Sequence, residues 1–187
     1  MLEKATELDP NYAAVYAFLS WNYFESWLFL WSPDPQTLER AFELAQKAVT
    51  LDDSSPLTHA TLGHIYLWKK QYDQAITEEE KAITLGPNCA LCYSELGNIL
   101  NYAGRPQDAI GLHEKAMRLS PQEMANYSYR LGEAYRLLGR YEEAIAATKR
   151  SLARRPSHLV VTLSWLLYTV NQVGKKKPGL RWQKSYG

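Results

Sequence analysis

The sequence has few cysteines and no excess of charge of either sign, and these two absences argue against several common classes of protein. Only two cysteines occur in 187 residues, too few for a disulfide framework, and this composition fits a reducing compartment. Neither sign of charge is in excess, because 21 Lys and Arg oppose 20 Asp and Glu, a formal net charge of +1. A nucleic-acid-binding protein needs a clustered basic face, so this balance argues against nucleic acid as a partner.

Targeting signals and long apolar runs are also missing. The N-terminus, Met1-Leu2-Glu3-Lys4, lacks the basic and then apolar regions of a signal peptide. The richest apolar window, 12–31, is interrupted by Asn22 and Glu25 and is crowded with Tyr and Trp, whereas a bilayer span needs about 20 mostly aliphatic residues. We therefore interpret this window as an amphipathic helix, and we expect a cytoplasmic protein without a membrane segment.

What the chain does contain is an unusual set of aromatic residues. There are 13 Tyr and 6 Trp against only 4 Phe. Amphipathic aromatic side chains are favoured where one end is buried and the other end meets solvent or a partner. This usage is typical of a protein whose aromatic residues take part in a contact surface.

A repeat of 34 to 35 residues organises the middle of the chain. Leu62-Gly63 recurs as Leu96-Gly97 and Leu131-Gly132, at offsets of 34 and 35, and one extra residue near Met124 accounts for the longer offset. Because several columns hold the same register over three units, the pattern cannot be an effect of composition. The other columns are Tyr66, Leu100 and Tyr135; Ala75, Ala109 and Ala144; Ala82, Ala116 and Ser151; and Pro87, Pro121 and Pro156.

Each column has a physical reason. A Gly next to the Leu, and a small Ala on the following helix, let two helices approach closely. The large Leu and Tyr side chains fill the space between units, and the Pro ends the second helix because it cannot continue the hydrogen-bond ladder. Gly104 and Gly139 stand where the first helix of a unit must stop, as expected of a C-terminal glycine.

These residues resemble the tetratricopeptide repeat, a helix–turn–helix unit of about 34 residues with Leu-Gly, Tyr, Ala, Ala and Pro at these spacings. The resemblance implies an all-α fold, a right-handed α-solenoid. It predicts regular repeats at 56–89, 90–124 and 125–158. The first unit, 11–55, is irregular, with helices expected at 13–27 and 36–51 and about nine extra residues between them.

The two ends of the chain depart from the repeat. Residues 1–10 are similar to the tail of a preceding repeat helix or to a cap, so we expect either a fragment of a longer protein or a capping helix. Residues 159–174 predict a partial repeat or capping helix, and 175–187 form a basic tail. Two interpretations of that tail stay open, a disordered segment and a frame-shifted end that replaces a further helix.

No pattern in the sequence predicts catalysis. The Cys89-x-x-Cys92 pair lies at a predicted helix N-terminus, where the helix dipole favours a thiolate, but no second pair completes a zinc site and no strand–helix context indicates a thioredoxin-like site. We interpret both cysteines as packing residues at a repeat junction. The three residues 78–80, all Glu, predict a solvated helix face, since consecutive helical residues point in different directions. We expect no enzyme activity, no metal and no cofactor.

The four histidines are not spaced as ligands either. His59, His64, His113 and His158 lie in different repeat positions, and no two of them make the i, i+4 pair of a helical metal site. His59 and His113 occupy columns that hold packing residues, whereas His64 is expected to point into the groove of the solenoid.

Stacked helix pairs curve so that their first helices line a concave groove. The resemblance implies that the side chains facing this groove are aromatic in the first half of the chain and polar or charged in the second. Such a surface suits an extended peptide or helix with one apolar anchor. For Trp21 and Phe24, packing beneath the irregular first unit is an equally weighted alternative. The predicted groove residues are Trp21, Phe24, His64, Trp68, Glu95, Asn98, Asn101, Tyr102, Tyr129, Arg130 and Glu133.

The family contains a subclass that clamps a C-terminal carboxylate with Lys, Asn and Arg. Of the corresponding positions here only Arg130 fits, so that specificity is disfavoured. Segments 100–106, 114–121 and 131–144 look more like the C-terminal repeats of bacterial proteins that carry an adenylate or guanylate cyclase domain or a winged-helix regulator domain. This implies a non-catalytic regulatory or scaffold module for protein or peptide partners. Self-association, with the groove as a by-product, is the alternative.

Overall fold

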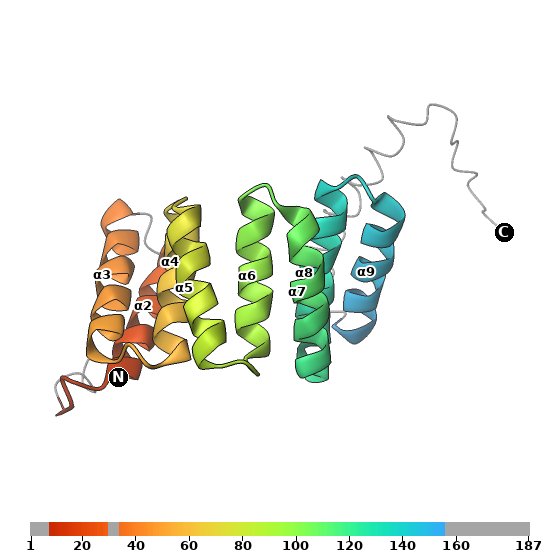
Figure 1. The fold of residues 1–187 in the computed structure, drawn as a ribbon. Helices are drawn as coiled ribbons and strands as arrows, with labels where there is room; N and C mark the ends of the chain where they lie inside the picture. Colours follow the sequence, from red (N-terminus) through yellow and green to blue (C-terminus); the bar gives the residue numbers. More distant parts are fainter. Residues whose placement is uncertain (1–7, 30–33, 156–187) are drawn as a thin grey trace.

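The computed structural model describes residues 8–29 and 34–155, and within these ranges the regular structure is entirely helical. The described part of the chain holds eight α-helices that pack as sequential pairs, each helix mainly against its neighbour in the chain, and Figure 1 shows the pairs side by side in one row. The predicted all-α repeat array is confirmed. The helices are α2 (Ala13–Leu28), α3 (Pro35–Leu51), α4 (Pro56–Trp68), α5 (Tyr72–Leu85), α6 (Ala90–Tyr102), α7 (Pro106–Leu119), α8 (Met124–Leu137) and α9 (Tyr141–Arg154).

Helix ends follow local sequence signals. Pro35, Pro56 and Pro106 each occupy the first position of a helix, where a missing N–H costs nothing. The Asp34 side chain accepts a hydrogen bond from the Gln36 N–H at 2.9 Å and caps α3. The extra residue between the second and third regular units coincides with a short 3₁₀ turn, Pro121–Glu123, before α8. The observed α2 and α3 agree with the helices expected in the first unit to within about a residue.

The glycine column sets the distance between paired helices, as predicted. A Cβ added to Gly63 or Gly132 would lie 3.2 or 3.3 Å from a backbone carbonyl oxygen of the facing helix, and one added to Gly97 would lie 2.7 Å from the His113 ring. Ala75, on the helix that faces Gly63, is fully buried. Consecutive first helices also contact one another, α2 with α4, α4 with α6 and α6 with α8.

The turn after each first helix uses a residue in the left-handed backbone conformation. Gly104 and Gly139 have φ of +77° and +73°, which confirms the predicted role of both glycines. Lys70 lies in the same column with φ of +60°, a conformation that a residue with a Cβ adopts at a cost. The first regular repeat therefore contains a strained turn that the next two avoid.

Lys70→Gly should raise the free energy of unfolding by about 0.5–1 kcal/mol, because the strain that it removes outweighs the freedom that it adds to the unfolded chain. The matched variant is Gly104→Ala, which should lower it by a similar amount: its added Cβ meets no atom within 4 Å, so the loss reports the backbone alone. Urea unfolding followed by circular dichroism measures both changes. A Lys70→Gly protein no more stable than wild type would show that the turn is unstrained.

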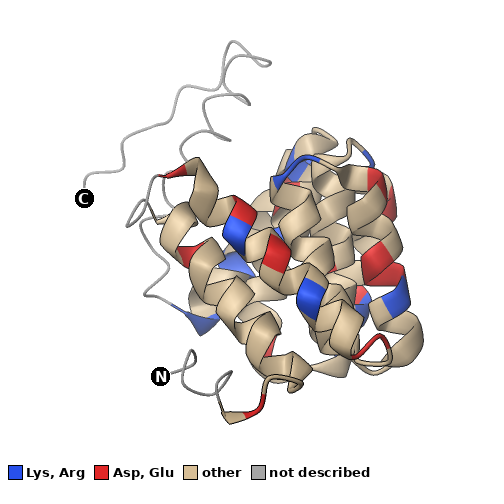
Figure 2. Cartoon of the chain, turned by 90° about the vertical axis from the view of Figure 1, so that its left-hand side faces the viewer, with Lys and Arg blue, Asp and Glu red and all other residues tan. Residues whose placement is uncertain are grey.

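Charges of both signs are interspersed over the helices. Figure 2 shows Lys and Arg alternating with Asp and Glu along the helices that face the viewer, without a large area of one sign on that side. No helix in 8–29 or 34–155 is both long and apolar enough to cross a bilayer. The predictions for the two ends, 1–7 and 156–187, lie outside the described residues, as does the part of the first-unit insertion at 30–33.

Candidate functional site: two pockets on the first helices

An ion pair with a buried carboxylate and a partly exposed guanidinium lies on the surface formed by the first helices. Glu95 of α6 is only 5% exposed, and Arg130 of α8 reaches it with two hydrogen bonds. The Arg130 Nη1 donates to Glu95 Oε2 at 2.9 Å, and the Nη2 donates to Oε1 at 2.7 Å. This two-pronged geometry fixes both side chains and joins consecutive repeats.

The same network extends to α4. The Trp68 Nε1–H donates to His64 Nε2 at 3.1 Å, and His64 Nδ1 lies 3.3 Å from Glu95 Oε2. Because Nε2 accepts a hydrogen bond, a neutral His64 ring carries its proton on Nδ1, and this N–H donates a hydrogen bond to the Glu95 carboxylate. One polar network therefore links the first helices of three consecutive repeats.

The charge on Glu95 is maintained by its partners. Burial works against ionisation, but Arg130 and the hydrogen bond from His64 outweigh it, so the pKa of Glu95 lies well below its ordinary range. Glu79 of α5 has the opposite environment. Burial raises its pKa well above the ordinary value, the negative charge of Glu95 raises it further, and Arg130 only partly opposes them.

Glu79 corrects a prediction. The sequence predicts a solvated face for residues 78–80, yet Glu79 is fully buried, and neither of its carboxylate oxygens has a hydrogen-bond partner in the described part of the chain. Its register gives the reason: Glu79 lies four residues after Ala75 and three before Ala82, on the helix face that packs against Gly63. That spacing was available in the sequence as a signal.

Two of the remaining histidines are packing residues, as predicted. His59 is buried, with Nδ1 2.5 Å from a Glu78 oxygen. His113 lies under Gly97, fully buried, and neither ring nitrogen has a partner among the residues described. Burial, with the nearby Arg130, lowers the pKa of His113 to about 3, so its ring is neutral near pH 7.

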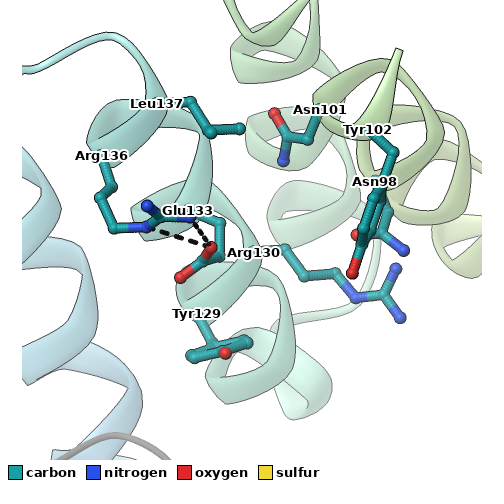
Figure 3. A pocket seen from close by; sticks show the side chains of 8 residues that line it. All are labelled: Asn98, Asn101, Tyr102, Tyr129, Arg130, Glu133, Arg136 and Leu137. Atoms are coloured by element: carbon teal, nitrogen blue, oxygen red, sulfur yellow. Dashed lines mark hydrogen bonds and ion pairs between the residues drawn. The ribbon is translucent and has the colours of Figure 1, made fainter. Parts of the chain in front are cut away.

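A polar pocket of about 450 Å³ opens on one side of the ion pair, between α6 and α8 (Figure 3). Asn101 is 7% exposed, and neither its Oδ1 nor its Nδ2 has a hydrogen-bond partner within the described ranges. Glu133 accepts hydrogen bonds from Arg136 through Oε2, whereas its Oε1 accepts none from a described residue. The pocket is lined by Asn98, Asn101, Tyr102, Tyr129, Arg130, Glu133, Arg136 and Leu137.

An apolar pocket of about 220 Å³ lies on the other side of the ion pair. Large apolar side chains border it and remain accessible: Phe18, Trp21 and Leu91 are 52%, 37% and 56% exposed. Glu95 lines this pocket and Arg130 lines the polar one, so the ion pair separates the two. The lining residues, all from α2, α4 and α6, are Ala17, Phe18, Trp21, Leu57, Ala60, Thr61, His64, Leu91 and Glu95.

The structure brings most of the predicted groove residues together. Trp21, His64 and Glu95 line the apolar pocket. Trp68 lines neither pocket and packs edge-on or tilted against Phe24, Trp27 and Tyr102. The predicted residues that line the polar pocket are Asn98, Asn101, Tyr102, Tyr129, Arg130 and Glu133.

Phe24 is a correction. It is 2% exposed and belongs to a core cluster with Ala41, Ala45, Leu62 and Ile65, so it is a packing residue beneath the first unit and not a groove residue. Helical register alone gives Trp21 and Phe24 adjacent directions, and the positions of α3 and α4 decide which one is covered. The pocket residues missing from the prediction include Leu57 and Leu91, which lie in the first turns of α4 and α6, and Leu137 at the end of α8.

The prediction that Cys89 and Cys92 are simple packing residues is wrong, because the two sulfurs are joined in a disulfide at the N-terminus of α6. The first helical turn brings their Cα atoms to 5.3 Å, a separation that a disulfide bridges. Among the described residues no group of three or more His, Cys, Asp or Glu is placed to hold a metal ion.

Comparison with known proteins agrees with the fold. Tetratricopeptide-repeat family models match residues 58–89 and 89–157, which together run without a gap through the three regular repeats. The chain is a tetratricopeptide-repeat protein. Modules of this family generally mediate protein–protein interactions.

Proteins similar to this tetratricopeptide-repeat chain differ in how much of their own length the match covers. A Rhizobium meliloti (strain 1021) protein named "Putative adenylate cyclase 3" is 38% identical over 76 residues, which cover 40% of this chain and only 13% of that protein. The crystal structure of TTC0263, a thermophilic TPR protein of Thermus thermophilus, matches with a TM-score of 0.74 at 18% identity over 90% of this chain and 87% of that one. MamA matches with a TM-score of 0.61 at 23% identity, covering 84% and 86%.

Proposed function

We propose that this chain is a non-catalytic interaction module that binds an extended peptide, or an extended segment of a partner protein, across the apolar and polar pockets. The supporting observation is the Asn101 side chain. Its amide is buried at the polar pocket, and both its donor and its acceptor lack partners among the described residues. A buried amide left unpaired costs free energy that a ligand recovers on binding.

A peptide backbone has the complementary groups. Asn presents one acceptor oxygen and two donor hydrogens, and a backbone unit offers an N–H and a C=O within reach of both. The apolar pocket, with Trp21 and Leu91 at its rim, suits one large apolar side chain of the same peptide. Because Glu95 and Arg130 already satisfy each other, the ligand needs no net charge where it crosses the ion pair.

We also propose that the module is a regulatory or scaffold part of a larger bacterial signalling protein. Support comes from the 38% sequence identity with the Rhizobium meliloti protein, whose name describes a cyclase. The match spans only 13% of that protein, so most of its length lies outside the matched segment. Whole-protein activity would then belong to another domain of that larger protein.

Asn101→Leu should weaken peptide binding without lowering stability. A random peptide library displayed on phage is selected against the wild-type chain, and the affinity of the selected peptide is measured by fluorescence anisotropy. Loss of the amide hydrogen bonds should raise the Kd by about tenfold, equivalent to roughly 1.4 kcal/mol. The matched control is Gln107→Leu, the same kind of change on an exposed residue of α7, a helix that lines neither pocket.

Trp21→Ala tests the apolar pocket with the same peptide and should weaken binding by at least a similar factor. If neither Asn101→Leu nor Trp21→Ala changes the Kd more than Gln107→Leu does, the pockets are not the binding surface. If no peptide is selected and light scattering shows a dimer that forms with rising concentration, self-association replaces peptide binding as the function.

A further inference from the structure

The N-terminus of α6 carries a feature that the peptide-binding proposal does not use, the Cys89–Cys92 disulfide. We propose that these two cysteines are a thiol–disulfide exchange site, which cycles between disulfide and dithiol by reaction with small-molecule thiols and disulfides of the glutathione class. The proposal rests on the pairing of the two sulfurs, their unequal exposure, and the hydrogen bond that the helix end supplies to one of them.

Unequal exposure gives the two sulfurs different roles. Cys92 is 2% exposed, packed inside the repeat, whereas Cys89 is partly exposed at the N-cap position. An external thiol or disulfide can therefore reach Cys89 but not Cys92. Cys89 is the attacking residue and Cys92 is the one that resolves the intermediate.

The helix end stabilises the reactive form. The Cys92 backbone N–H donates to Cys89 Sγ at 3.2 Å, and no acidic residue occupies the first turn of the 13-residue helix. After reduction the same N–H group, together with the positive end of the helix dipole, favours a thiolate on Cys89. A thiolate is the form that attacks a disulfide.

The exchange is balanced in two steps. The Cys89 thiolate attacks one sulfur of a disulfide RSSR, an S–S bond forms between Cys89 and one R–S group, and the other leaves as RS⁻. Cys92 then loses its proton and attacks Cys89 Sγ, which displaces the second RS⁻ and forms the Cys89–Cys92 bond. Overall two protein thiols are oxidised, one RSSR is reduced to two RSH, and excess RSH drives the reverse reaction.

The position of the disulfide connects the exchange site to the apolar pocket. Leu91 lies between the two cysteines and borders that pocket, and Glu95 lies one turn further along α6. Opening the disulfide releases a covalent constraint on the turn that holds Leu91. Hydrogen exchange of the backbone amides of residues 90–95 should therefore be faster in the reduced chain.

The test is a redox titration of the full chain. Samples equilibrate in buffers of different ratios of reduced to oxidised glutathione, free thiols are blocked with N-ethylmaleimide, and intact mass counts the labels. We expect a reversible change between no label and two labels, with single labels minor. Variants assign the roles: Cys92→Ala should accumulate a glutathione adduct on Cys89, and Cys89→Ser should form an adduct at least about tenfold more slowly, since its remaining thiol is buried.

Both variants suit their positions, because Ser is a preferred N-cap residue and Ala is small enough for the buried site. Circular dichroism checks that each is folded. Three results would overturn the proposal: two labels at every glutathione ratio, a disulfide that is reduced only after urea unfolds the chain, or equal adduct rates in the two single variants.

Discussion

Replacing Arg130 with methionine should lower the free energy of unfolding by about 3 kcal/mol, the cost of leaving the buried Glu95 carboxylate without its charged partner. Methionine keeps much of the side-chain volume but removes both hydrogen bonds to Glu95. The Glu95 carboxylate, which is 5% exposed in the wild-type chain, would then keep only the hydrogen bond with His64 among the described residues. Urea unfolding at pH 7 measures the loss, and circular dichroism follows the transition.

Two further variants distinguish the loss of the ion pair from the loss of stability that any arginine replacement causes. Glu95→Leu combined with Arg130→Met should recover most of the loss, because no charge is then buried alone. Arg40→Met is the matched surface control: its pair with Glu43 is more than half exposed, so the change should stay within about 0.5 kcal/mol. If Arg130→Met is no more destabilising than Arg40→Met, the pair does not contribute to holding the repeats of α6 and α8 together.

Glu79→Gln should stabilise the protein near pH 7, and the stabilisation should disappear in acid. In the folded chain the pKa of Glu79 is raised by burial, so wild type must either take up a proton or bury a charge as it folds. A raised folded-state pKa gives stability that is complete below the ordinary carboxyl range and is lost as the pH rises through the folded-state value. The glutamine variant has no such loss.

The measurement is the free energy of unfolding of both proteins from about pH 4, near the ordinary carboxyl pKa, up to about pH 8. The difference should be near zero at the acid end and should grow with pH. Glu95 has the opposite sign, because its folded-state pKa is lowered, and Glu95→Gln should lose stability relative to wild type above the ordinary range. A Glu79→Gln advantage that does not change with pH would show that Glu79 titrates in the folded chain as it does in the unfolded one.

Much of the fold follows from the sequence because its columns are tied to backbone geometry. Gly97 and Ala109 predict close helix pairs, and Gly104 predicts the left-handed turn, since few other residues satisfy these local requirements. These constraints act within one repeat. They can therefore be predicted from the residues of that repeat, without reference to the neighbouring repeats.

The site was less predictable because its contacts cross between repeats. Register predicts that Glu95 and Arg130 face the same surface, but not that 35 residues of separation place the guanidinium against the carboxylate. Both were expected to meet a ligand, and both are used internally. The same limit explains Phe24, which the neighbouring helices cover. Glu79 is different, because it is buried within its own repeat and its spacing from Ala75 and Ala82 predicts that burial.

The most direct test of the proposed function is the footprint of the selected peptide on the chain. Isotope-labelled protein is titrated with that peptide, and nitrogen–proton NMR spectra report each backbone amide, the Asn101 side-chain amide and the Trp21 indole. Binding across the two pockets predicts that the largest shifts fall on Asn101, Trp21 and the residues of α6 and α8 that line the polar pocket. Shifts confined to α3, α5, α7 and α9, with the Asn101 amide unchanged, would contradict it.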